Sequence, residues 1–214
     1  MIALLIDGQV LLFAVLLVTI IISLSFHEFG HAWSAKYYGD NTAESLGRLT
    51  LNPVSHIDPT GLLMIILVGF GWAKPVPTNP RNFNSFWATL FIALAGPAAN
   101  LILAFLAVNV YVLGASNNVE FMLQQGTQTF FYWFTYINLL LMLFNLIPLG
   151  PLDGHYILPY FLPKRISQKY RELNQQYGGF AILGLVLLSY AGLPIFSGLK
   201  SAADWFIPVL RVVG

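Results

Sequence analysis

The sequence predicts an all-α polytopic membrane protein, a bundle of about 5–6 transmembrane helices. Two observations support this fold class. Of the 214 residues, 57% are hydrophobic and only 9% are charged, whereas a soluble domain usually carries about a quarter charged residues. Charge-free runs also recur along the chain, and a spanning helix needs roughly 20 mostly apolar residues. This composition excludes an ordinary soluble enzyme, a disordered chain and a nucleic-acid-binding protein.

Four charge-free stretches are expected to form the main helices. The first begins after Asp7, where twenty residues pass before the next charge at Glu28. It is not a cleavable signal peptide, because no basic region precedes it and the helical pattern continues past Phe26. The expected helices lie near 9–38, 86–113, 128–147 and 178–193. The last stretch, 194–214, fits an interfacial segment or a last tilted helix.

A shorter apolar run over 61–72 ends in a glycine-rich turn that contains Gly69 and Gly71. It is too short for a full span, so we expect a small re-entrant or β-like segment near 45–76. The longest polar stretch, about 38–60, is too short for a second domain. We therefore expect residues 1–214 to form a single membrane-embedded domain.

The distribution of Lys and Arg predicts the orientation in the membrane. These residues are concentrated in 38–84 and 164–172, and the loop 114–127 contains none. Cytoplasmic loops carry the excess of Lys and Arg, so the two basic regions should lie inside the cell and 114–127 outside. The first helix then ends in the cytoplasm near Lys36.

A metal-binding pattern lies near the end of the first helix, in His27-Glu28-Phe29-Gly30-His31. Residues i and i+4 share one helix face, so the two imidazoles can bind one zinc while Glu28 acts as a general base. The alternative is a chance match, or two histidines satisfied by hydrogen bonds at a helix end. Ionisable side chains in an apolar helix are costly and need a role, which favours the metal site. The site would lie toward the cytoplasmic side, one or two turns before Lys36.

The sequence leaves the third zinc ligand open. The chain has no Cys, so the ligand must be His, Asp or Glu. Asp153 is the best candidate because it follows an apolar helix and a turn that contains Pro148 and Pro151. Asp153 could instead cap the helix that begins after it. His56 and His155 are the competing ligands.

Together these motifs resemble the site-2 protease family of intramembrane zinc metalloproteases, and in particular its short prokaryotic members. The matching segments are His27–His31, Gly47–Pro53 with His56–Pro59, Gly71–Val76, Ala95–Asn100 and Asn145–Gly154. The resemblance implies that His27, His31 and Asp153 hold one zinc per chain and that Glu28 activates water. Larger relatives add a PDZ or CBS module, for which this chain has no room.

The resemblance also implies further site residues. Asn100 is expected near the active site as a catalytic aid, although an Asn in a membrane helix could simply hydrogen-bond a neighbouring helix. Gly69, Gly71 and Trp72 are expected to belong to an extended segment that pairs with substrate, although the two glycines could form a plain turn. Gly96 is expected to let helices pack closely.

The function implied is an endopeptidase that cleaves membrane-embedded protein substrates. Its location would be the prokaryotic inner membrane, with the lipid bilayer and the substrate as its partners and no nucleic acid. The sequence says nothing about oligomeric state. A metal-ion transporter or sensor that uses the same histidines is the alternative, although a base beside the ligands argues against it. An inactive membrane scaffold is a third reading.

Overall fold

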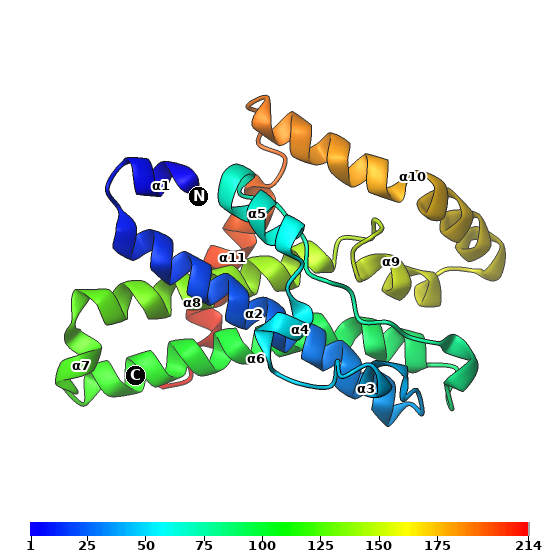
Figure 1. Cartoon of the computed structure of the whole chain (residues 1–214), viewed down its shortest axis with the longest axis horizontal. Helices are drawn as coiled ribbons and strands as arrows, with labels where there is room; N and C mark the ends of the chain where they lie inside the picture. The colour runs from blue at the N-terminus through cyan, green and yellow to red at the C-terminus, as the bar shows by residue number, and fades with distance from the viewer. Residues whose placement is uncertain (214) are drawn as a thin grey trace.

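The computed structural model describes residues 1–213, which are mainly helical and contain no β-strand. The long helices are α2 (Val10–Tyr37), α6 (Ala88–Ser116), α8 (Gln125–Asn145), α10 (Lys164–Tyr190) and α11 (Ser197–Leu210). The short helices are α1 (Ile2–Ile6), α3 (Thr42–Ser45), α4 (Pro53–His56), α5 (Pro59–Val68), α7 (Glu120–Leu123) and α9 (Gly154–Ile157), with 3-10 turns η1 (Pro80–Asn82) and η2 (Leu158–Phe161). Figure 1 shows their arrangement.

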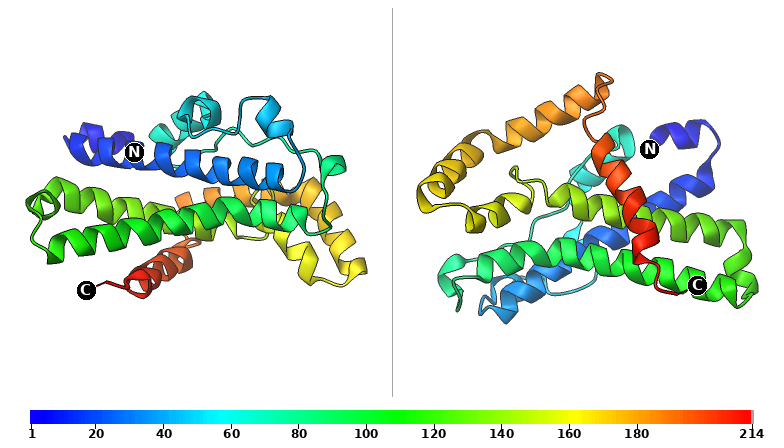
Figure 2. Two further views of the ribbon diagram at one scale, coloured as in Figure 1. Left: turned by 90° about the horizontal axis from the view of Figure 1, so that it is seen from below. Right: turned by 180° about the vertical axis from the view of Figure 1, so that it is seen from behind.

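Helices α2, α6 and α8 form the centre of the molecule and run alongside one another in Figures 1 and 2. Gly30 lets α2 approach α6 closely, since a Cβ at this position would lie 2.7 Å from the carbonyl oxygen of Ala95. Helix α11 crosses the other face of α6 and α8. Ala203 of α11 is fully buried there against Ala104 and Leu139. The expectation of an all-helical chain is confirmed.

Two helices of the described chain, α2 and α6, are both long and apolar enough to cross a membrane. Helix α5 is apolar but has only 10 residues. Helices α8 and α10 are long enough, but polar residues in their N-terminal halves reduce their apolar length. The larger count of five or six spans therefore stays a prediction.

Helix α10 begins earlier than the sequence pattern indicated. A helix was expected only near 178–193, with 164–172 as a basic loop. The structure instead has one continuous helix from Lys164 to Tyr190. The basic first half lies largely exposed and buries few side chains, Asn174 among them, so it is a surface helix that continues into the apolar half.

The segment between α2 and α6 is a chain of short helices rather than a β-structure. Asp58 caps α5 by accepting hydrogen bonds from the amides of Thr60 and Gly61. Helix α5 ends at Gly69, whose φ of +85° favours glycine. The β-like element expected near 45–76 is reduced to one isolated antiparallel bridge, between Ile57 and Ala73, within the described residues.

Asp40 links the start of this segment, near Thr42, to its end, near Asn79, through hydrogen bonds. It is fully buried and accepts hydrogen bonds from the amide and hydroxyl of Thr42, the amide of Asn79 and the side chain of Asn82. Burial raises the pKa of Asp40, but these hydrogen bonds outweigh it and hold the pKa below its usual value. The segment is thereby closed into a compact cover beside the C-terminal half of α2.

Candidate metal centre

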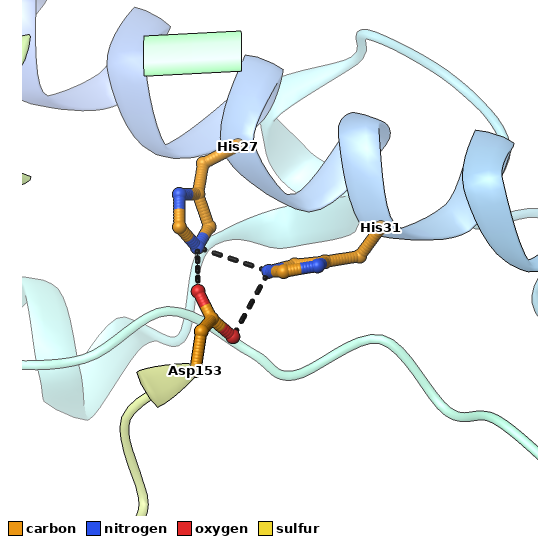
Figure 3. Close-up of side chains that lie close together, drawn as sticks. All are labelled: His27, His31 and Asp153. Atoms are coloured by element: carbon orange, nitrogen blue, oxygen red, sulfur yellow. Dashed lines mark hydrogen bonds and ion pairs between the residues drawn. The ribbon is translucent and has the colours of Figure 1, made fainter. Parts of the chain in front are cut away.

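Three side chains from two distant parts of the chain converge on one point (Figure 3). His27 and His31 come from adjacent turns of α2, and Asp153 directly precedes α9. The two Nε2 atoms are 3.0 Å apart. Asp153 places Oδ2 3.2 Å from Nε2 of His27 and Oδ1 3.3 Å from Nε2 of His31.

The outer nitrogen of each imidazole is held by an acceptor, and this fixes which nitrogen carries the proton. Nδ1 of His31 lies 2.7 Å from the carbonyl oxygen of Ile92, which can only accept. Nδ1 of His27 lies 2.7 Å from Oδ1 of Asn100. Both Nδ1 atoms therefore donate, and both Nε2 atoms turn unprotonated lone pairs toward Asp153.

This donor set fits a zinc ion. Two imidazole lone pairs and a carboxylate repel one another unless a cation lies between them, and Oδ2 of Asp153 is buried without a hydrogen-bond partner. Ligands bound tetrahedrally at about 2.0–2.1 Å lie about 3.3 Å apart, close to the separations here. Two His and one carboxylate are also a usual ligand set for catalytic zinc.

The structure separates the three candidates for the third ligand. His56 is fully buried away from the centre, with Nε2 2.6 Å from the carbonyl oxygen of Thr50. His155 turns Nδ1 to the carbonyl oxygen of Leu152. Asp153 occupies the N-cap position of α9, but its side chain makes no capping hydrogen bond. Of the three, only Asp153 reaches the two α2 histidines.

Asn100 lies behind His27 as seen from Asp153. Besides accepting from His27, it donates through Nδ2 to the carbonyl oxygen of Ser23 at 3.2 Å and to Oδ1 of Asn138 at 2.9 Å. Both Nδ2 protons are thus engaged, and neither is free to stabilise a substrate oxyanion. The geometry suits a residue that orients the His27 ring.

Glycine at position 96 makes room for both imidazoles. A Cβ there would lie 2.4 Å from Nε2 of His31 and 2.7 Å from Cε1 of His27. The sequence suggested helix packing for Gly96, and the structure adds clearance for the two imidazoles.

The loop that carries Asp153 is braced by α10. Oδ1 of Asn174 accepts a hydrogen bond of 2.9 Å from the amide of Gly150. The hydroxyl of Tyr170 donates to the carbonyl oxygen of Pro148 at 2.7 Å. Neither residue was identified from the sequence, because a basic loop was expected over 164–172 and a helix only near 178–193, and nothing local indicated contact with the Asp153 loop.

Glu28 follows His27 and is buried, with 7% of its surface exposed. Its Oε2 accepts a hydrogen bond of 3.2 Å from the amide of Val76. The extended stretch after α5 therefore passes directly beside the carboxylate expected to act as base.

The other expected substrate residues lie just upstream of this contact. Gly71 packs against Gly61, since a Cβ on Gly71 would lie 2.1 Å from the carbonyl oxygen of Gly61. Trp72 is half exposed, and Gly69 ends α5. The two glycines thus have clear structural roles in the turn, and only Trp72 presents a large side chain outward.

The fold and the site together define a helical, metal-dependent hydrolase built around an HExxH helix. The model of Peptidase family M50 matches residues 15–119 and 112–187. Two curated relatives share the name "Putative zinc metalloprotease". YwhC of Bacillus subtilis (strain 168) is 36% identical, and the match covers 92% of this chain and 91% of YwhC. Rip2 of Mycolicibacterium smegmatis is 32% identical, and the match covers 80% of this chain and 65% of Rip2. No solved structure matches.

The chain belongs to peptidase family M50, the site-2 protease family. It is a zinc metalloprotease, and zinc is its cofactor. This agrees with the resemblance and disfavours the transporter alternative.

Proposed function

We propose that this protein is an intramembrane endopeptidase, a single membrane-embedded domain over 1–214 that hydrolyses a peptide bond in or near a transmembrane segment of a membrane-protein substrate. The observation that carries the proposal is the depth of the site. His27 lies 17 residues after Val10 in an apolar helix, about 26 Å along its axis. A site at that depth in a spanning helix meets peptide bonds within the bilayer.

The side of the membrane follows from charge. His31 precedes Lys36 by five residues, about 7.5 Å along the helix. If the basic region after α2 lies in the cytoplasm, the site lies in the inner half of a prokaryotic cell membrane. Helices α8, α10 and α11 would complete a multi-pass bundle around α2 and α6.

Glu28 is the group that moves protons in this mechanism. When bound, zinc polarises the scissile carbonyl and lowers the pKa of water to about 7. Glu28 takes the proton of the attacking water and then delivers it to the leaving amine. The hydrogen bond from the Val76 amide fixes the orientation of the Glu28 carboxylate. Asn100 fixes the orientation of the His27 ring by accepting a hydrogen bond from Nδ1.

The extended segment beside Glu28 supports a mode of substrate recognition. A helical substrate must unwind before attack, because its amides are buried in intrahelical hydrogen bonds. Within the described residues, the backbone amide and carbonyl of Ala73 make no hydrogen bond. An unwound stretch could add to this edge as a strand, beside Trp72.

A trapping experiment tests the proposal. Tagged single-span reporter proteins are co-expressed with the wild-type enzyme or with Glu28→Gln, and the fragments are compared. Glu28→Gln should keep zinc and substrate but lose hydrolysis by about 10²–10⁴-fold, since an amide cannot accept the proton. Uncut reporter should co-purify with the variant. Cleavage by Glu28→Gln at the wild-type rate would refute the mechanism.

The membrane arrangement has its own test. The natural chain has no cysteine, so Asn117→Cys and Gln168→Cys each introduce a single label at an exposed position. An impermeant thiol reagent should label position 117 from outside and position 168 only after the cytoplasmic face is opened. Labelling of both from one side would contradict the proposed bundle.

A further inference from the structure

Arg48 is a buried cation that the mechanism above does not use. It lies between α3 and α4 with 6% of its surface exposed. Its guanidinium donates through Nη2 to the carbonyl oxygen of Lys74 at 2.6 Å and through Nη1 to that of Pro75 at 3.1 Å. Burying a charge is costly unless hydrogen bonds compensate it. These two contacts supply compensation at the end of the guanidinium, whereas Nε is buried without a hydrogen-bond partner.

His56 completes this arrangement. Its Nε2 faces the carbonyl oxygen of Thr50 and must donate to it, which leaves Nδ1 as an acceptor 3.5 Å from Nη2 of Arg48. The backbone carbonyl of His56 also accepts a hydrogen bond of 2.8 Å from the amide of Lys74. Arg48 and His56 thus both hydrogen-bond to the backbone of residues 74–75, Arg48 through its side chain and His56 through its carbonyl oxygen.

The backbone that Arg48 and His56 hold leads directly into the residue that hydrogen-bonds Glu28. The backbone carbonyls of Lys74 and Pro75 accept hydrogen bonds from the Arg48 guanidinium. The amide of the next residue, Val76, donates a hydrogen bond to Oε2 of Glu28. Burial lowers the pKa of Arg48, and the Glu28 carboxylate partly offsets this by favouring the cation. The guanidinium is therefore coupled to Glu28 both through the backbone and through charge.

We propose that Arg48 is a positioning residue of this protease: by holding the carbonyls of Lys74 and Pro75 it sets residues 73–76 against Glu28, so that this extended stretch both orients the base and offers the backbone of Ala73 to substrate. This inference rests on the proposed function. Arginine suits the role, because its planar fork reaches two acceptors in a fixed geometry and a lysine ammonium does not.

Hydrogen exchange of the zinc-loaded protein tests, without any substrate, whether Arg48 holds residues 73–76 in place. In the stretch 70–78, the amides that donate a hydrogen bond are those of Lys74 and Val76. Arg48→Met keeps an unbranched apolar stem like that of arginine and removes the guanidinium. A peptide covering 70–78 should then gain two deuterons at times when the wild-type peptide stays protected.

The matched control is Arg81→Met, which removes the same charge from an exposed position of the same segment. It should leave exchange in 70–78 and cleavage unchanged. Unchanged exchange in Arg48→Met would overturn the proposal. So would loss of zinc together with raised exchange throughout α2 and α6, in both Arg48→Met and Arg48→Lys, because Arg48 would then serve the whole fold.

Cleavage provides the second measurement, on a single-span reporter that the wild-type enzyme cuts. Misplacing a reacting group by about 1 Å can cost about 10²-fold, so kcat in Arg48→Met should fall by about 10–10² while zinc content stays at the wild-type level. Arg48→Lys, which keeps the charge but not the fork, should fall in the same direction. Wild-type kcat in both variants would overturn the proposal. If the wild-type enzyme cuts no reporter, the proposed function fails, and the exchange measurement still decides whether Arg48 holds the segment.

Discussion

Replacing Gly96 by alanine should weaken zinc binding strongly without unfolding the protein. Gly96 lies inside α6, where alanine is favoured over glycine by roughly 0.5–1 kcal/mol, so the helix itself gains. The added Cβ would nevertheless lie 2.4 Å from Nε2 of His31 and 2.7 Å from Cε1 of His27. The three atoms nearest to this Cβ all belong to the imidazoles of His27 and His31, so the substitution acts first on the two proposed zinc ligands.

The magnitude follows from these distances. Non-bonded carbon contacts have their optimum near 3.5 Å, so the His31 ring must move by about 1 Å. Zinc ligands keep their distances to about 0.2 Å, and the ring cannot shift this far while Nδ1 stays on the carbonyl of Ile92. Losing an outer-shell partner already costs 10–100-fold in affinity. Displacing the ligands should cost at least about 10²-fold, or about 2.7 kcal/mol.

The assay is zinc content after purification, followed by competition with a chelator of known affinity. Gly184→Ala is the matched control, a glycine of α10 where an added Cβ meets no atom within 4 Å. It should bind zinc like the wild type, and both variants should keep the wild-type helix content by circular dichroism. Wild-type zinc affinity in Gly96→Ala would refute the assigned ligand geometry.

Two further predictions concern the supports of the site. Asn174→Leu should weaken zinc binding about 10-fold by releasing the Gly150 amide that braces the Asp153 loop; chelator competition that shows no change would exclude this brace. Because the folded-state pKa of Asp40 is lowered, its contribution to stability is complete above about pH 3.9, the ordinary value, and is lost as pH falls through the folded-state pKa. Asp40→Asn should therefore show a smaller drop in thermal midpoint between pH 6 and pH 3 than the wild type, and equal drops in both would contradict the reasoning. Asp7→Asn, at an exposed position, is the control.

The helices could be predicted where a single local signal sufficed. Long charge-free runs indicated α2, α6 and α8, and their observed ends lie within a few residues of the expected ones. The start of α10 was missed, because charged residues between Lys164 and Glu172 are equally typical of a loop and of an exposed helix face. An amphipathic helix depends on a neighbouring surface, which the local sequence does not show.

The common direction of the two helix histidines was likewise predictable from local sequence. His27 and His31 lie four residues apart on adjacent turns of one helix, so their common direction follows from helix geometry alone. The sequence also puts Glu28 directly next to His27. These local relations hold whatever the rest of the chain does.

Everything that joins distant segments was decided by tertiary structure. From the sequence, Asp153, His56 and His155 remained rivals for the third position, and only the packing of the Asp153 loop beside α2 brings one of them within 3.3 Å of the histidines. The role of Arg48 depends in the same way on residues 26 and 27 positions further along. Helical periodicity constrains neighbours up to four residues apart, whereas contacts between segments depend on how whole helices pack, and that is set by the sum of many weak interactions.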